Sequence, residues 1–325
     1  MRLIFFGTPE IAAPSLEYLI NKQDIDVAAV VTQPDRPSGR GNKLTPPPVK
    51  VTALKYEIQV FQPNSIRKEP ELIETLKQLN ADVFISFAFG QILSQEVIDI
   101  PRLGIINLHA SLLPKYRGAN PIQRAIVNGD KVTGVTTMLT SIGVDEGDII
   151  LKKEIEINED MNSAELAQKI AEISPKLIYE SIIGLNNGTI VPAPQNHGAA
   201  TRAPKFKKED GIIDWSDSAI NIHNRVRGLY PWPSAYTAYN NTLLKIISTK
   251  VLKDEKNVNN CAQGEIMDII KEGIKVATGD GIILIKQLQP AGKKEMDAKS
   301  WANGAKIYKG YKGCKGQFFT KEITT

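Results

Sequence analysis

The chain has few of the residues that mark metal-binding, secreted or membrane-spanning proteins. Its 325 residues include only two cysteines, Cys261 and Cys314, whose spacing matches no metal site. Two cysteines are too few for a disulfide framework, so they indicate a reducing, cytoplasmic setting. No apolar run approaches the ~18–20 residues of a membrane span, and no charged-then-apolar signal segment precedes the first strand-like stretch. We therefore expect a cytoplasmic protein without a metal ion or a membrane anchor.

The glycine-rich turn of dinucleotide-binding enzymes is missing too. The stretch Leu3–Phe6 has the continuous apolar character of a buried strand and leads into Thr8 and Pro9. Thr8 is a favourable helix N-cap and Pro9 fits the first helical position. The apolar stretch 27–31 predicts a second strand after that helix. A strand–helix–strand unit indicates a parallel sheet covered on both faces, and the missing glycines argue against an NAD enzyme.

Net charge differs between the two parts of the chain. Residues 200–325 contain 21 Lys and Arg against 13 Asp and Glu, a net charge of +8. The whole chain has +4, which leaves −4 for residues 1–199. A basic second part predicts a polyanionic partner, with a lysine-rich solvated surface as the alternative. The length of the chain favours two domains over one.

The stretch 105–114 carries the clearest sign of chemistry. It begins as an apolar run typical of a strand and ends at Pro114. Asn107 and His109 are two residues apart, so in a strand their side chains lie on one face. A turn at 142–148 offers Asp145, a carboxylate that can meet His109. The alternative is a structural role, in which Asn107 caps a turn and His109 is a satisfied core histidine.

These residues carry a resemblance to a known family. Asn107, His109 and Asp145, with Ser-Leu-Leu-Pro after the histidine and Gly-Val-Asp-Glu-Gly-Asp around the aspartate, are similar to the catalytic set of the 10-formyltetrahydrofolate-dependent formyltransferases. The supporting motifs span nearly the full length: Phe-Gly-Thr-Pro at 6–9, Thr-Gln-Pro-Asp-Arg-Pro at 32–37, Ile-Asp-Trp at 213–215, Tyr-Pro-Trp-Pro at 230–233 and Gln-Pro-Ala-Gly-Lys-Lys at 289–294. Each motif alone is weak, but the ordered set is specific.

The resemblance implies a fold and an activity. We expect an α/β, Rossmann-like, mostly parallel sheet domain over residues 1–190, a linker over 191–208, and a small OB-like β-barrel domain over 209–325 that binds tRNA and ends in a basic tail. The implied reaction moves the formyl group of the co-substrate 10-formyltetrahydrofolate to the amino group of initiator methionyl-tRNA, for translation initiation, and the implied enzyme is a monomer. Folate contacts are expected from Phe87, Phe89, Gly90, Ser111, Leu112, Leu113 and Pro114. Contacts with tRNA are expected from Arg36, Arg40, Lys43, Lys205, Lys208, Lys293 and Lys294.

Two basic segments are expected to reach the tRNA. The connection from Gln33 to Lys50 is long, polar and rich in proline, and loops of that length without structure of their own tend to be functional. We expect Arg40 to enter near the acceptor end, with a plain surface insertion as the alternative. The segment 306–315 places a lysine at every third position among glycines and aromatics. It predicts a basic strand or arm that touches phosphates, or an inert tail.

Formyl transfer to an amine is acyl transfer, which requires an oxyanion stabiliser and a proton acceptor but no serine or cysteine nucleophile. Asn107 can supply an amide N–H and His109 an imidazole N–H to the oxyanion. Asp145 can orient His109 and take up the amine proton, directly or through a water. A formyltransferase for glycinamide ribonucleotide or an amino-sugar nucleotide would have the same three residues, and so stays an alternative. A noncatalytic RNA-binding protein on the same scaffold is the alternative from another class, although binding alone does not need this set.

Overall fold

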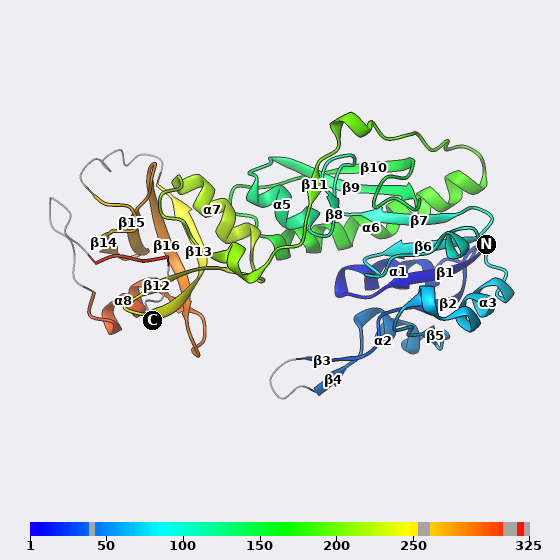
Figure 1. Cartoon of the computed structure of the whole chain (residues 1–325), viewed down its shortest axis with the longest axis horizontal. Coiled ribbons are helices and arrows are strands. Elements are labelled where there is room, and N and C mark those ends of the chain that lie inside the picture. Colours follow the sequence, from blue (N-terminus) through cyan, green and yellow to red (C-terminus); the bar gives the residue numbers. More distant parts are fainter. Residues whose placement is uncertain (39–42, 253–260, 308–316, 322–325) are drawn as a thin grey trace. The chain divides into compact units, whose positions relative to one another are not determined.

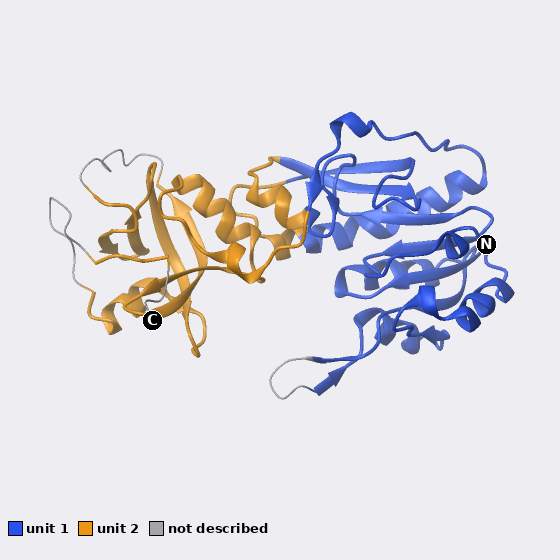
Figure 2. Cartoon of the chain, in the orientation of Figure 1, with its two compact units in different colours: residues 1–121, 132–156, 167–203 blue, residues 122–131, 157–166, 204–325 orange. Residues whose placement is uncertain are grey.

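The computed structural model describes residues 1–38, 43–252, 261–307 and 317–321. They form two compact units, coloured separately in Figure 2. Unit 1 comprises residues 1–121, 132–156 and 167–203, and unit 2 comprises residues 122–131, 157–166 and 204–325. Unit 2 therefore includes two short segments from the first half of the chain. The boundaries 1–190, 191–208 and 209–325 stay a prediction for the functional domains.

The first half of the chain alternates strands and helices, as Figure 1 shows. Up to the central strand the elements are β1 (Arg2–Gly7), η1 (Glu10–Ala12), α1 (Ala13–Ile20), β2 (Asp26–Val31), β3 (Arg36–Ser38), β4 (Lys43–Thr45), α2 (Pro48–Lys55), β5 (Val60–Phe61), η2 (Ile66–Lys68), α3 (Pro70–Gln78), β6 (Val83–Phe87), α4 (Gln95–Ile98) and β7 (Ile105–His109). Those that follow are β8 (Arg117–Gly118), α5 (Pro121–Val127), β9 (Val132–Leu139), β10 (Ile149–Glu156), α6 (Ser163–Asn186), η3 (His197–Ala199) and β11 (Arg202–Ala203).

Seven strands of unit 1 form one sheet in the order β10-β9-β7-β6-β1-β2-β5. The five strands from β7 to β5 are parallel, and β9 and β10 add an antiparallel edge. This arrangement confirms the Rossmann-like, mostly parallel sheet. Parallel strands need a crossover between them, and the intervening helices supply it.

The two faces of this sheet are covered by different helices. On one face Ile4, Phe84 and Ile105 belong to an apolar cluster that includes residues 73 and 76 of α3. On the other face α6 meets β9, where the Thr137 and Ser181 hydroxyls lie 2.7 Å apart. Side chains alternate between faces along a strand, so the continuous apolar sequence of these strands reflects burial on both sides.

Two local predictions for unit 1 were wrong. The connection 33–50 is not without structure, because β3 and β4 pair as an antiparallel hairpin within it, which extends away from the sheet in Figure 1. Thr8 does not cap the first helix. Its hydroxyl donates instead to the Phe89 carbonyl oxygen (3.0 Å), and Gln33 Nε2 donates to the same oxygen (3.1 Å). The base of the hairpin is thereby bonded to the loop after β6.

Unit 2 is built on an antiparallel sheet. Its further elements are η4 (Lys208–Gly211), α7 (Ala219–Gly228), β12 (Ala235–Tyr239), β13 (Thr242–Val251), β14 (Ile266–Ile270), β15 (Gly273–Ala277), β16 (Ile282–Pro290), β17 (Met296–Asp297) and α8 (Ala298–Gly304). The sheet order is β12-β13-β16-β15-β14, with β17 paired to β16. Residues 317–321 join its two ends, because Phe318 bridges Glu265 and Thr320 bridges Ala238. The sheet thereby closes into a small barrel, as expected.

The Ile-Asp-Trp motif at 213–215 has a structural role in this barrel. Trp215 is buried and stacks on Phe319, with ring centroids 5.6 Å apart. Asp214 forms an ion pair with Lys321 (2.6 Å), which lowers the pKa of the Asp214 carboxyl to about 2, with Ser216 as a second hydrogen-bond donor. Both contacts fix residues 317–321 on the barrel.

Two further expectations can be compared with the structure. No helix among the described residues is long and apolar enough to cross a membrane. Cys261 is disulfide-bonded, whereas the cysteine count had indicated reduced thiols. Cys314 and most of the basic segment 306–315 lie outside the described residues.

Candidate active site

The candidate site begins where two neighbouring parallel strands end. Ser86 of β6 pairs in register with Asn107 of β7, and their side chains continue the sheet face that is apolar at Phe84 and Ile105. His109 follows two residues later on the same face. The carboxyl ends of parallel strands are where open α/β sheets bind ligands. The fold therefore puts Asn107 and His109 where the sequence pattern predicted them.

The turn between β9 and β10 brings Asp145 to His109. Asp145 Oδ2 lies 3.5 Å from His109 Nδ1, and the two side chains are 15% and 7% exposed. The same oxygen accepts a hydrogen bond from the Gly118 backbone N–H (2.8 Å). Asp145 has φ +55°, a left-handed conformation that is uncommon outside glycine. The predicted meeting of Asp145 with His109 is present in the structure.

The other nitrogen of His109 is also engaged. His109 Nε2 lies 2.8 Å from the Tyr116 carbonyl oxygen, which can only accept, so we assign the hydrogen to Nε2. Nδ1 then faces the Asp145 carboxylate. An imidazole that carries hydrogen on both nitrogens satisfies both acceptors at once, so the pair can take up one further proton. The core-histidine alternative is thus correct for Nε2, but it does not explain Asp145.

Asn107 opens onto a cavity of about 160 Å³. The cavity is lined by Ser86, Gln91, Ile92, Leu93, Asn107, Met138, Thr140, Ser141, Ile142, Gly143, Val144 and Asp145. Among the described residues nothing hydrogen-bonds to the Asn107 side-chain amide. Buried or half-buried amides are normally paired, so this amide is available to a ligand. The described part of the chain contains no group of three or more His, Cys, Asp or Glu that could hold a metal ion.

None of the seven residues that were predicted to bind folate lines this cavity, and most of them are buried. Phe87 and Phe89 are 2% and 3% exposed. Ser111 and Leu113 are fully buried, and the Ser111 hydroxyl donates to the Lys115 carbonyl oxygen (2.6 Å). Leu112 and Pro114 are half-buried, and only Gly90 is exposed. Contact of these seven residues with folate stays a prediction.

Of the residues that line the cavity, only Asn107 and Asp145 were predicted as site residues. Ile92, Ile142 and Val144 are 59%, 67% and 58% exposed. Exposed aliphatic residues that gather at the rim of one cavity can mark a binding site. The signal in the sequence was the mixture of aliphatic residues and turn residues at 140–148. Without the fold, this mixture is not distinguishable from that of an ordinary surface turn.

The cations that were predicted to bind tRNA lie at the surface of both units. Arg36 and Lys43 are exposed on the β3–β4 hairpin of unit 1, whereas Arg40 lies outside the described residues. In unit 2 the exposed cations are Lys205, Lys208, Lys293 and Lys294. Trp232 of the Tyr-Pro-Trp-Pro motif, which was not predicted to bind tRNA, is 57% exposed on the loop between α7 and β12. Contact of these residues with tRNA stays a prediction.

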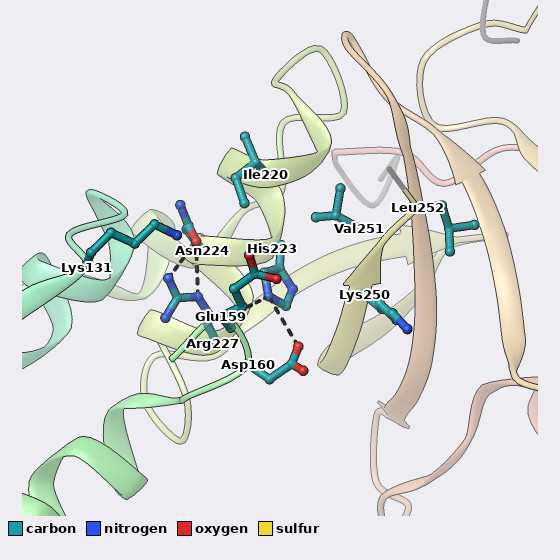
Figure 3. A pocket seen from close by; sticks show the side chains of 10 residues that line it. All are labelled: Lys131, Glu159, Asp160, Ile220, His223, Asn224, Arg227, Lys250, Val251 and Leu252. Carbon is teal, nitrogen blue, oxygen red and sulfur yellow. Dashed lines mark hydrogen bonds and ion pairs between the residues drawn. The ribbon is translucent and has the colours of Figure 1, made fainter. Parts of the chain in front are cut away.

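A larger cavity, of about 510 Å³, lies in unit 2 beside α7. Figure 3 shows His223, Asn224 and Arg227 of α7 beside Glu159 and Asp160. Arg227 donates to Asn224 Oδ1 (3.1 and 2.8 Å), and His223 Nε2 lies 3.0 Å from the Glu159 carbonyl oxygen. Burial lowers the pKa of His223 below its usual value. Because these polar groups satisfy one another, we explain them by packing within unit 2.

Comparison with known proteins places this geometry in a family. Residues 1–182 match the family described as formyl transferase, and residues 205–306 match the formyl transferase C-terminal domain. The methionyl-tRNA formyltransferase of Ruminiclostridium cellulolyticum is 46% identical over 312 residues, which cover 96% of this chain and 99% of that protein. The enzyme of the same name from Clostridium perfringens is 48% identical over 307 residues, which cover 94% and 98%.

Solved structures show the same fold at lower identity. A sugar 3N-formyl transferase, crystallised with dTDP and 5-N-formyl-THF, has a TM-score of 0.67 at 19% identity and covers 90% of this chain and 99% of its own. An N-formyltransferase from Helicobacter canadensis has a TM-score of 0.64 at 22% identity, over 87% and 98%. These two establish the fold alone. On the near-full-length identity to its relatives and the two family matches, the chain belongs to the methionyl-tRNA formyltransferases.

Proposed function

We propose that this protein transfers the formyl group of 10-formyltetrahydrofolate to the free amino group of initiator methionyl-tRNA. One observation carries the proposal: the unpaired Asn107 amide opens onto the same cavity as Asp145, which faces His109 at 3.5 Å. A donor for an oxyanion and an acceptor for a proton therefore lie side by side. Acyl transfer to an amine requires both.

In the proposed mechanism the amine attacks the formyl carbon, and the carbonyl oxygen becomes an oxyanion. The Asn107 amide donates to that oxyanion. The proton that leaves the nitrogen passes to the His109–Asp145 pair, which has room for one proton between Nδ1 and Oδ2. The oxyanion then re-forms the carbonyl while the bond from the formyl carbon to N10 of the folate breaks, and N10 takes up a proton, so that tetrahydrofolate leaves. The N–H donation by His109 to the oxyanion, as predicted from sequence, requires Nε2 to leave the Tyr116 carbonyl. We therefore assign proton transfer as the main role of His109.

The co-substrate fits the cavity in part. At about 160 Å³ it is smaller than the roughly 300–1,000 Å³ of pockets that enclose a whole ligand. It matches one flat ring system, such as the pterin, with the remainder of the folate outside. The exposed aliphatic side chains Ile92, Ile142 and Val144 would cover the faces of such a ring. The formyl group would then lie toward Asn107.

The acceptor is proposed to be tRNA because both units present exposed cations. Lys205 and Lys208 lie near the start of the 204–325 segment of unit 2, and Lys293 and Lys294 lie on the turn between β16 and β17. Phosphate contacts of this kind supply affinity that does not depend on sequence. Exposed Trp232 offers a face on which an unpaired base can stack. The acceptor end of a tRNA provides unpaired bases of that kind.

The test is a formylation assay with purified protein, 10-formyltetrahydrofolate and charged initiator tRNA. We expect a blocked methionyl amine after deacylation, and none with Asn107→Ala. Glycinamide ribonucleotide and a dTDP-amino sugar serve as competing acceptors. Formylation of either of those, without formylation of the tRNA, would overturn the proposed acceptor but keep the reaction. No formylation of any acceptor would overturn the proposal as a whole.

A further inference from the structure

The segment that follows α6 folds back onto unit 1 instead of leaving it. Ala193 and Ile149 exchange two backbone hydrogen bonds (2.8 and 2.9 Å). Ten residues later β11 pairs with β8, with Arg202 opposite Arg117. The part of the chain that sequence analysis treated as a linker is thus held at both ends. Between these two attachments lies Gln195, which is 5% exposed.

Gln195 is bonded to the turn that carries Asp145. Its Nε2 donates to the Asp145 carbonyl oxygen (2.9 Å) and to the Gly147 carbonyl oxygen (2.8 Å). An amide nitrogen has two hydrogens, and both are used on this one turn. The two carbonyls lie on either side of Glu146, so these two hydrogen bonds fix the backbone of the turn next to Asp145.

Arg117 fixes the orientation of the Gln195 amide. Arg117 Nε and Nη2 both donate to Gln195 Oε1 (3.1 and 2.8 Å). Because a guanidinium only donates, the amide oxygen has to face Arg117, and the amide nitrogen has to face the turn. Arg117 is 8% exposed and also pairs with Glu146 (3.1 Å). The next residue, Gly118, donates its backbone N–H to the Asp145 carboxylate.

The turn needs such support because its own packing is weak. Ile142 and Val144 are largely exposed, and Asp145 has a positive φ. Non-glycine residues in that conformation persist where their surroundings hold them. Segments with few buried apolar contacts open at low free-energy cost. Without the Gln195 bonds, the backbone of this turn would be held less firmly, and the carboxylate of Asp145 would depend on the Gly118 N–H to keep its place beside His109.

We propose that Gln195, oriented by Arg117, is a positioning residue that holds Asp145 against His109 for proton transfer. This role rests on the proposed function of the Asn107, His109 and Asp145 site. Gln195 does not itself line the cavity, so it acts through Asp145. The same turn carries Ile142 and Val144, which line the cavity, so binding of the formyl donor also depends on Gln195, whereas the exposed cations proposed to bind tRNA do not contact it.

The test compares Gln195→Met, which keeps the length of the side chain but has no donor, with the wild type. We expect kcat to fall by about 10- to 100-fold, the scale of a misplaced reacting group. KM for tRNA should change less than about twofold, a readout that a general loss of structure would not give. KM for the formyl donor is expected to rise with the shift of the turn, because Ile142 and Val144 lie in it and line the cavity. Gln168→Met is the matched control, since Gln168 is exposed on α6 and bonds only to Glu172 among the described residues; it should keep the wild-type kcat.

A double-mutant cycle separates positioning from a structural role. If Gln195 acts through Asp145, then Gln195→Met should cost less than about twofold in an Asp145→Asn background, because coupled residues are not additive. Equal losses in both backgrounds, or a wild-type kcat for Gln195→Met, would overturn the proposal. Gln195→Glu is the second variant, for the case that the methionine variant does not fold. It keeps an acceptor for Arg117 but places a carboxylate oxygen, which cannot donate, against the two carbonyl oxygens of the turn, so at least the same fall in kcat is expected.

A crystal structure of the variant tests the positioning role of Gln195 without any measurement of activity, and so independently of the proposed function. In Gln195→Met or Gln195→Glu we expect the turn 141–148 to shift and the distance from His109 Nδ1 to Asp145 Oδ2 to exceed the 3.5 Å of the wild type. An unchanged turn would overturn the positioning role whatever the activity. Failure of the wild type to formylate any acceptor would overturn the proposed function and leave this structural result to be judged by itself.

Discussion

Replacement of Asp145 by asparagine changes the charge at the candidate site with little change in shape. The asparagine oxygen can still accept from the Gly118 N–H, which lies 2.8 Å from the present carboxylate. That oxygen is also the atom that faces His109 Nδ1, so in the variant a neutral amide oxygen stands where the carboxylate charge was. An amide oxygen stabilises a protonated imidazole far less than a carboxylate does, so the pair takes up the proton that leaves the amine much less readily. We expect the variant to fold and to lose turnover.

The size of the loss follows from the geometry. Two unit charges 3.5 Å apart interact by about 5 kcal/mol at an effective dielectric constant of about 20. Desolvation of the pair offsets part of this energy, since both side chains are largely buried. Loss of one acid–base group commonly costs about 10²- to 10⁴-fold in rate. We therefore expect kcat to fall by about 10²- to 10³-fold.

Single-turnover formylation at saturating formyl donor measures this step directly. KM for the donor should stay near the wild-type value, because the Asn107 side of the cavity is unchanged. Asp148→Asn is the matched control, since Asp148 is exposed in the same turn and should keep its activity. A kcat within about threefold of the wild type for Asp145→Asn would refute the reasoning, because proton uptake would then not involve this pair.

Four further outcomes are expected. Gly147→Ala should lower both stability and kcat, because a Cβ there would overlap the Leu139 carbonyl oxygen; thermal unfolding and formylation rates would measure it. Trp232→Ala should raise KM for tRNA by about 10-fold, on the scale of one lost base stack, with KM for the formyl donor unchanged. The Asp214 carboxyl has a pKa of about 2, below its usual 3.8, so its stabilising contribution is present above about pH 4 and lost as the pH falls toward 2. The free energy of unfolding of Asp214→Asn should therefore fall less steeply with pH over that range than that of the wild type. Burial lowers the pKa of His223 below 6.5, so stability should fall as the pH drops below 6.5, and the slope should be smaller in His223→Gln.

Local sequence patterns were sufficient for the parallel sheet and for Asn107 and His109. The period of two along a strand places those two side chains on one face whatever the rest of the chain does. The apolar runs of β1, β2 and β6 required burial on both faces, which only a helix-covered parallel sheet provides. Family motifs added Asp145, whose meeting with His109 the fold then produced.

Local patterns gave wrong predictions where a polar group forms a hydrogen bond with a residue that is distant in the sequence. Thr8 has the chemistry of an N-cap, but its hydroxyl donates to the Phe89 carbonyl, 81 residues away. A helix cap and a long-range bond compete for the same hydroxyl, and only the packing of β1 against β6 decides between them. The hairpin of β3 and β4 was missed because three-residue strands carry almost no periodic signal.

The sequence by itself determined the kinds of side chain available: an amide, an imidazole and a carboxylate at strand ends and turns, with cations concentrated in the second part of the chain. Only the tertiary structure decided which groups meet and which remain free. Gln195 lies 50 residues from Asp145 in sequence, and no local pattern links a glutamine in a proline-bearing segment to the turn that carries Asp145. A hydrogen bond over such a separation requires a long loop to close, which costs conformational entropy. Packing of the sheet offsets that cost, and the two bonded residues do not. For that reason the chemistry could be predicted from sequence, whereas the support that holds it in place could not.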